Sequence, residues 1–263
     1  MELHEVVAIV TGGARGFGRA FAEKILLEQG KVLLTDVDGP TLEATGKKLQ
    51  CQYGETNVCW QLQNVTEEGS FKRAFAYGFK YFQEPVNVLV NNAGIVSNRS
   101  FFEGGNTHWE TVIQVDLAAI IRGTKCAVAE FKRTLNGREG VVVNVGSMAG
   151  LTTTPFAPDY AAAKAGVVGF TRSLYPLQKS DNMRCFCMCP GFAETDMGRL
   201  AEEMLPEYTN MTDGLMPVQV VVDAFVAGLR EPDNAGRVQS IMKKSTMYFR
   251  FPGDKVLFPN SRL

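Results

Sequence analysis

Residues 6–18 of this 263-residue chain read VVAIVTGGARGFG, and this stretch decides the fold. The apolar, β-branched run at its start predicts a buried strand, and a helical pattern follows from Gly18. Between them, Gly12, Gly16 and Gly18 allow the backbone to turn sharply and to approach a pyrophosphate closely. Free amides and the positive end of the helix dipole would meet the charge of that group. We therefore expect a strand, a phosphate-binding loop and a helix.

The same alternation of strand and helix continues along the chain. Continuous apolar runs predict strands that are covered on both faces, at residues 6–10, 32–34, 86–90, 141–145 and 184–189. Helical patterns separate them, at residues 18–29, 40–50, 66–82, 107–135 and 160–177. This order predicts the α/β class: a Rossmann-type, doubly wound parallel sheet with helices on both faces. We expect a single domain over residues 1–263, with a less regular segment at 192–216.

Composition excludes several other classes of protein. The chain has 27 Lys and Arg against 28 Asp and Glu, so no basic field exists to bind nucleic acid. No apolar run approaches the ~20 residues that span a bilayer, and the first residues do not resemble a secretory leader. We therefore expect a cytoplasmic protein with reduced thiols. Alternating Cys185, Cys187 and Cys189 read as one face of a buried strand, and no metal site is expected.

An acidic residue at the end of the second predicted strand selects the nucleotide. Asp36 is placed to accept a hydrogen bond from a ribose 2′-hydroxyl and to repel a 2′-phosphate, which favours NAD as the cofactor. Arg15, inside the glycine-rich loop, argues for the opposite preference, because a guanidinium pairs well with a 2′-phosphate. We favour NAD, and an NADPH-dependent ketoreductase remains the alternative.

A phenol and an ammonium form the candidate catalytic group. Tyr160 and Lys164 lie at i and i+4 of a predicted helix and so share one face. Ser147 follows the strand at 141–145, at the carboxyl end where open α/β sheets bind ligands. We expect the Lys164 charge to lower the pKa of Tyr160 enough for it to act as a general base in alcohol oxidation. Ser147 would then hydrogen-bond the substrate oxygen.

These motifs together resemble the short-chain dehydrogenase/reductase family over nearly the whole chain. The resemblance is carried by TGGARGFG at 11–18, NNAG at 91–94, Ser147, Tyr160-x-x-x-Lys164 and Pro190-Gly191. Within that family, Gly150-Leu151, VVGFTRS at 167–173, CPGF at 189–192 and IMK at 241–243 are most similar to the 15-hydroxyprostaglandin dehydrogenase branch.

The resemblance implies a role for each matching position. Around the adenosine and pyrophosphate it implies Gly12, Arg15, Gly16, Phe17, Gly18, Asp36, Asn64 and Val65. Around the nicotinamide and its ribose it implies Asn91, Ala93, Gly94, Tyr160, Lys164, Pro190, Phe192 and Thr195. It also implies a homodimer or homotetramer.

Two positions depart from the family pattern. Asn64 stands where an Asp is usual, although an amide still offers a donor and an acceptor to adenine. Asp116 stands where the fourth catalytic residue, an Asn, is expected. Asp116 substitutes if that position acts through its backbone carbonyl, and its extra carboxylate would shift the pKa of Lys164. These departures keep open a second class of function, a nucleotide-binding regulatory protein with weak turnover.

The remaining features concern substrate and location. Methionines and leucines in segment 192–216, including Met197, suit a lid over an apolar substrate. With Phe156 and Phe192 they favour a bulky, apolar secondary alcohol or its ketone. The final residues, Ser261-Arg262-Leu263, are a conservative variant of a peroxisomal address, which makes a peroxisomal location the alternative to the cytoplasm.

Overall fold

The computed structural model describes residues 1–96, 101–102 and 108–254. Its strands are β1 Val7–Thr11, β2 Lys31–Asp36, β3 Val58–Leu62, β4 Val88–Asn91, β5 Gly140–Val145, β6 Met183–Pro190, β7 Val238–Met242 and β8 Ser245–Tyr248. Its α-helices are α1 Gly16–Leu27, α2 Gly39–Tyr53, α3 Ser70–Phe82, α4 His108–Ile113, α5 Ala119–Thr134, α6 Pro158–Arg172, α7 Leu177–Asp181, α8 Asp196–Met204, α9 Pro206–Met211 and α10 Val218–Arg230. Short 3₁₀ turns cover Leu3–Glu5, Glu55–Asn57 and Met148–Gly150, and a π-helical turn covers Gln114–Ala118.

The strands form one sheet in the order β3-β2-β1-β4-β5-β6-β7-β8. All neighbours are parallel except β7 and β8, which are antiparallel. The order reverses between β1 and β4, and open α/β sheets bind ligands at the carboxyl ends of the strands beside such a reversal. This architecture confirms the predicted doubly wound α/β fold.

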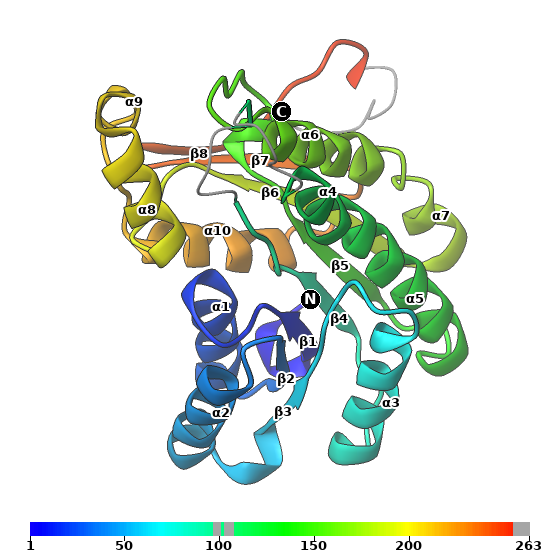
Figure 1. The fold of residues 1–263 in the computed structure, drawn as a ribbon. Helices are drawn as coiled ribbons and strands as arrows, with labels where there is room; N and C mark the ends of the chain where they lie inside the picture. The colour runs from blue at the N-terminus through cyan, green and yellow to red at the C-terminus, as the bar shows by residue number, and fades with distance from the viewer. Residues whose placement is uncertain (97–100, 103–107, 255–263) are drawn as a thin grey trace.

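Alternate residues of the strands enter two cores, one on each face of the sheet. On β1, Ala8 and Val10 pack with Phe21 of α1 and Phe225 of α10, and α2 covers the same face. Val7 and Ile9 belong to the other core, with α3 and α5, and Val167 and Val168 of α6 extend that layer over β6. Figure 1 shows these two layers of helices on either side of the sheet.

The sequence prediction misses three strands, and all of them lie toward the edges of the sheet. β3 and β8 are the edge strands and β7 is the neighbour of β8. β7 and β8 contain polar residues where an interior strand would be apolar, and β8 is largely exposed. A strand with one uncovered face or edge needs fewer apolar residues, so a continuous apolar run does not reveal it.

A helix lies at each of the five predicted places, but with different bounds, and α8, α9 and α10 were not predicted as helices. The helix expected at 66–82 begins at Ser70, and the one expected at 160–177 is two helices, α6 and α7. The helix expected at 107–135 is α4, a π-helical turn and α5 in succession. Residue 107 lies outside the described residues, as does the C-terminal tripeptide at 261–263. Within the described part of the chain, no helix is both long and apolar enough to cross a membrane.

Candidate functional site

The glycine loop, residues 11–18, connects the carboxyl end of β1 to the first turn of α1. Gly12 has φ +63° and Gly16 φ +55°, a region that glycine enters without strain. A Cβ on Gly18 would lie 2.2 Å from the Gly12 carbonyl oxygen, so this position has no room for a side chain. Arg15 precedes the helix but makes no side-chain hydrogen bond to it, and the first turn of α1 holds no acidic residue. The amides and the positive dipole of α1 therefore suit an anion.

The side chains of Phe17 and Thr11 connect the loop to the rest of the protein. Phe17 packs against the core beside Phe21, with ring centroids 6.1 Å apart, and its side chain is partly buried. The loop is tied to the end of β4 by Asn92, whose amide donates to the carbonyls of Thr11 at 2.9 Å and Gly12 at 3.1 Å. In return, Thr11 Oγ1 accepts from the backbone N–H groups of Asn92 and Ala93. Thr11 and Asn92 were not among the predicted site residues, although both lie within the quoted motifs.

Asp36 ends β2 directly beside the glycine loop. Its carboxylate accepts hydrogen bonds from the backbone N–H of Ala14 at 3.1 Å and of Asp38 at 3.0 Å. The guanidinium of Arg15 pairs with Asp38 at 2.9 Å and, more loosely, with Asp196 of α8 at 3.8 Å. The cation that favoured a 2′-phosphate is therefore already engaged by carboxylates.

Asn64 and Val65, the residues expected to contact adenine, follow the end of β3. Asn64 Oδ1 accepts from the backbone N–H and the hydroxyl of Thr66, so its carbonyl is used in its own turn. Val65 is buried in the core. Val37 and Leu62, which follow or end β2 and β3 beside Asp36, are 70% and 65% exposed. Neither of these two exposed apolar residues was among the predicted site residues.

Asn91 lies in a buried polar network at the end of β4. Its side chain is buried and donates to Asn144 Oδ1 at 2.9 Å and to Thr124 Oγ1 at 3.2 Å. Asn144, in turn, donates to Thr171 of α6 at 3.0 Å. This buried polar network joins β4, β5, α5 and α6 beneath the site. Asn144 interrupts the apolar run of β5, which is the sequence signal that prediction passed over.

Ser147, Tyr160 and Lys164 come together beyond the carboxyl end of β5. Ser147 begins the 3₁₀ turn at Met148–Gly150, and Gly150 packs directly on the Lys164 backbone, so this turn rests on α6. Lys164 is buried and donates to the Val145 carbonyl at 3.0 Å. Its Nζ lies 5.5 Å from the centre of the Tyr160 ring. The i, i+4 spacing therefore places the ammonium and the phenol on one face of α6, as predicted.

Asp116 joins this group from the π-helical turn. Its side chain is fully buried, Oδ1 accepts from the Ile95 N–H at 2.8 Å, and Oδ2 lies 3.1 Å from Lys164 Nζ. Gly94 leaves space for this pair, because a Cβ there would approach Asp116 Oδ2 at 3.0 Å and Lys164 Nζ at 3.5 Å. The contact is made by the Asp116 carboxylate, the group expected to shift the pKa of Lys164.

The ion pair changes the acid–base properties expected for Tyr160. Burial raises the pKa of the phenol, the Lys164 ammonium and the Ser147 side chain lower it, and the Asp116 carboxylate raises it, with an upward net direction. Lys164 lowers the pKa of Tyr160 as the sequence predicts, but burial is the larger effect and the net direction is upward. Burial lowers the pKa of Lys164, but Asp116 and Tyr160 outweigh it and raise that pKa.

Residues after β6 border the glycine loop from the other side. Pro190 ends β6, and Phe192 accepts a backbone hydrogen bond from Met216 at 2.9 Å, which holds the base of segment 192–216 together. Thr195 caps α8, and its methyl group lies 3.7 Å from the position that a Cβ on Gly16 would take. The segment contains α8 and α9 rather than being irregular. Met197 and Met204 are exposed on it, whereas Met216 is buried.

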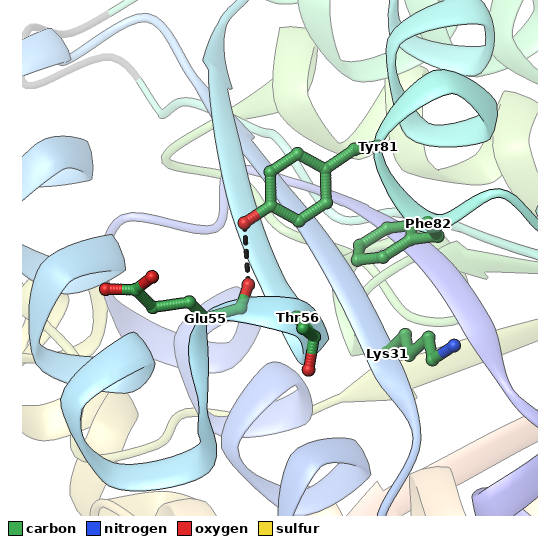
Figure 2. A pocket seen from close by; sticks show the side chains of 5 residues that line it. All are labelled: Lys31, Glu55, Thr56, Tyr81 and Phe82. Carbon is green, nitrogen blue, oxygen red and sulfur yellow. Dashed lines mark hydrogen bonds between the residues drawn. The ribbon is translucent and has the colours of Figure 1, made fainter.

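A shallow hollow at the amino end of β2 lies apart from all of these residues. It is lined by Lys31, Glu55, Thr56, Tyr81 and Phe82, and Figure 2 shows the Tyr81 hydroxyl donating to the Glu55 carbonyl, at 2.6 Å. The Lys31 ammonium is paired with Glu84 at 2.6 Å. The hollow lies at the amino ends of the strands, whereas open α/β sheets bind ligands at the carboxyl ends, and its cation is already paired. We therefore do not assign the functional site to it.

The sequence and the fold are similar to those of known proteins. The short chain dehydrogenase family matches residues 6–206. The 15-hydroxyprostaglandin dehydrogenase [NAD(+)] of Mus musculus is 33% identical over 95% of this chain and 94% of its own length. That of Rattus norvegicus is 28% identical over 99% of this chain and 98% of its own length.

Two further proteins widen the comparison. The 3-oxoacyl-[acyl-carrier-protein] reductase of Aquifex aeolicus is 32% identical over 79% of this chain and 82% of its own length. A short chain dehydrogenase/reductase from Burkholderia phymatum, solved in complex with NAD, superposes with a TM-score of 0.76 and is 25% identical over 87% of both chains.

Proposed function

The chain belongs to the short-chain dehydrogenase family, and we propose that it is an NAD-dependent enzyme that interconverts a bulky, apolar secondary alcohol and its ketone. One observation carries the proposal. Ser147, Tyr160 and Lys164 meet at the carboxyl end of β5, on the edge of the sheet that also holds the glycine loop and Asp36. A proton-transferring group and a nucleotide-binding loop thus lie at one edge, where open α/β sheets bind their ligands.

The residues at this edge fit a dinucleotide. The uncapped first turn of α1 and Gly12, Gly16 and Gly18 would hold the pyrophosphate, while Asp36 would hold the adenosine ribose. Toward the nicotinamide, the proposed contacts are Ala93, Gly94, Asn91 through its backbone, Tyr160, Lys164, Pro190, Phe192 and Thr195. When bound, NAD supplies the acceptor or donor of the two electrons.

The chain's own residues would handle the proton. The Ser147 hydroxyl would hydrogen-bond the substrate oxygen, and the Tyr160 hydroxyl would take a proton from an alcohol or give one to a carbonyl. Lys164 would hold the nicotinamide ribose and bias the phenol electrostatically. Support for these roles comes from the mutual placement of the three side chains, because Tyr160 and Lys164 share α6 and Ser147 begins the 3₁₀ turn that packs against that helix.

An apolar substrate is supported by the segment that borders the site. Met197 on α8 is 37% exposed, and Phe192 and Leu200 are half-buried, so apolar surface is available beside the glycine loop. Such surface favours a ligand with a hydrocarbon body over a sugar. The similarity to two 15-hydroxyprostaglandin dehydrogenases over nearly the full chain supports the same class of substrate.

An NADPH-dependent ketoreductase is the second candidate. The similarity to a 3-oxoacyl-[acyl-carrier-protein] reductase and the position of Arg15 favour it. The pairing of Arg15 with Asp38, and the Asp36 carboxylate at the ribose position, count against it. Titration of the protein with NAD and NADP, followed by intrinsic fluorescence, separates the two candidates, and tighter NADP binding would reject the first.

Tyr160→Phe tests the catalytic part of the proposal. We expect cofactor binding to persist and turnover of a panel of secondary alcohols and ketones to fall by about 10²–10⁴-fold, the usual contribution of a general acid or base. Absorbance of the reduced nicotinamide measures turnover, and fluorescence titration measures binding. As a control, Tyr175→Phe, on the exposed connection between α6 and α7, should leave both unchanged. Full turnover in Tyr160→Phe would reject the mechanism.

A further inference from the structure

The buried carboxylate of Asp116 is the feature that the family mechanism does not require. It comes from the π-helical turn and is 0% exposed, and its two oxygens face the Ile95 N–H and the Lys164 ammonium. The ammonium is also held by the Val145 carbonyl at 3.0 Å. Lys164 is thus fixed by two oxygen acceptors, one of which carries a full charge.

This pairing reduces what the cation can do for the phenol. The carboxylate lies 3.1 Å from Lys164 Nζ, whereas the Tyr160 ring centre lies 5.5 Å from it. The carboxylate therefore offsets part of the Coulomb attraction by which the ammonium would stabilise a phenolate. Burial is the largest cause of the raised pKa of Tyr160, and the Asp116 charge adds to that rise while Lys164 opposes it.

Other titratable groups face the same cluster from the elements packed around it. Asp159 lies in the first turn of α6 and is buried; burial raises the pKa of Asp116, and the Asp159 charge adds to that rise. Cys187 and Cys189 on β6 are buried with their sulfurs 3.7 Å apart, and the pKa of Cys189 is raised well above its usual value, so that thiol stays neutral. Ser147 contributes a neutral hydroxyl. Among these described neighbours, Asp116 is the carboxylate in direct contact with Lys164.

We propose that Asp116, acting through Lys164, keeps the Tyr160 hydroxyl protonated at neutral pH and makes the site a proton donor to a carbonyl oxygen. The inference deepens the proposed function and rests on it: ketone reduction would be favoured near neutrality, and alcohol oxidation would need alkaline conditions. In reduction, the Tyr160 O–H bond breaks and an O–H bond forms on the substrate. The reduced nicotinamide is the reductant, and Tyr160 recovers its proton from water. Asp116 is therefore a positioning residue and not a catalytic one.

Direct titration of the phenol tests this without cofactor or substrate. Ionised tyrosine absorbs near 295 nm. The chain has 7 tyrosines, and subtracting the titration of Tyr160→Phe from that of the wild-type protein leaves the signal of Tyr160. In the wild-type protein we expect Tyr160 to remain protonated through pH 10. In Asp116→Asn we expect its ionisation to move downward by about one pH unit or more, because the ammonium then acts without a counter-charge.

Two controls make the titration decisive. The double variant Asp116→Asn/Tyr160→Phe should lack the shifted transition, which assigns it to Tyr160. Circular dichroism verifies that Asp116→Asn is folded. If that variant does not fold, the titration of the wild-type protein minus that of Tyr160→Phe still tests the proposal. Ionisation of Tyr160 near neutral pH in that difference would overturn it. An unshifted transition in folded Asp116→Asn would overturn it as well.

Turnover gives the second readout. The oxidation kcat/KM of the wild-type protein should still be rising at pH 9, and that of Asp116→Asn should level off about one pH unit lower, while substrate KM changes little. Rescue of the wild-type profile by Asp116→Glu would support a role for the charge. Absence of turnover in every protein would reject the proposed function and leave the absorbance result to decide the role of Asp116. Normal turnover with identical pH profiles would reject this inference alone.

Discussion

At the glycine loop, a ligand's charge would be met by backbone amides and a helix dipole, whereas at Tyr160 the charge is carried by a buried ion pair of side chains. Asp36 is itself held by two backbone N–H groups, while Asp116 is held by Lys164 and one N–H. The first region depends on glycine at fixed positions and little on the ionisation of neighbours. The second depends on two opposite charges that the interior tolerates only together.

The strongest test of this difference is Lys164→Met, which leaves the Asp116 carboxylate buried without its cation. We expect turnover to be lost and the free energy of unfolding to fall by about 3–5 kcal/mol, as when one partner of a buried pair is removed. Denaturant unfolding measures the loss. Adding Asp116→Asn should restore much of the stability but none of the activity, because the unpaired charge is then absent. Lys179→Met, on the exposed face of α7, is the control. Equal stability of Lys164→Met and the control would contradict a paired charge.

Gly18→Ala tests the backbone-built region. The new Cβ would lie 2.2 Å from the Gly12 carbonyl oxygen, so the loop must move. We expect a loss of about 1–3 kcal/mol in stability from this overpacking and at least a tenfold loss of NAD affinity. Thermal unfolding and fluorescence titration measure the two effects. Gly169→Ala is the matched control, because a Cβ on this helical glycine of α6 meets nothing within 4 Å. Its methyl group should raise stability by up to about 1 kcal/mol, and similar effects of the two substitutions would show that the loop is not tightly packed.

Asp36→Asn should have the smallest effect and concerns selectivity alone. The amide keeps one acceptor for the two N–H groups and loses the negative charge. We expect the ratio of NAD to NADP affinity to fall by on the order of tenfold, about 1.4 kcal/mol, with little change in stability. Calorimetric titration with both nucleotides measures the ratio. Glu43→Gln, an exposed acid of α2 that pairs with Lys47, should leave it unchanged. A constant ratio in Asp36→Asn would assign selectivity to another residue.

The two regions also differ in how well sequence predicts them. The glycine loop and Asp36 could be placed because their geometry follows from residues adjacent in the chain, a strand, a turn and a helix. The spacing of Tyr160 and Lys164 likewise predicted a shared helix face. The acid–base properties could not be derived from that spacing, because Asp116 reaches Lys164 only through the packing of the π-helical turn against α6. Pairwise estimates along one helix omit such partners.

The same reasoning explains the fold. Strands in the middle of the sheet were found from their apolar runs, while β3, β7 and β8 near its edges were not. Asn91 and Asn144 show a related limit. From sequence alone, a polar residue near the end of a strand can be interpreted either as a ligand contact or as part of a buried hydrogen-bond network. Only its partners in the folded structure distinguish these interpretations.

The π-helical turn has a consequence for how this protein tolerates changes in length. In it, the N–H of Ala119 donates to the carbonyl of Gln114, five residues earlier, so the turn holds one residue more than an α-helical turn would. Deleting a single residue there would restore regular α-helical winding and leave the flanking turns of α4 and α5 in phase. The side chains of the turn itself, Asp116 among them, would then take other positions. Homologous chains that lack the extra residue should therefore place a different side chain beside the lysine.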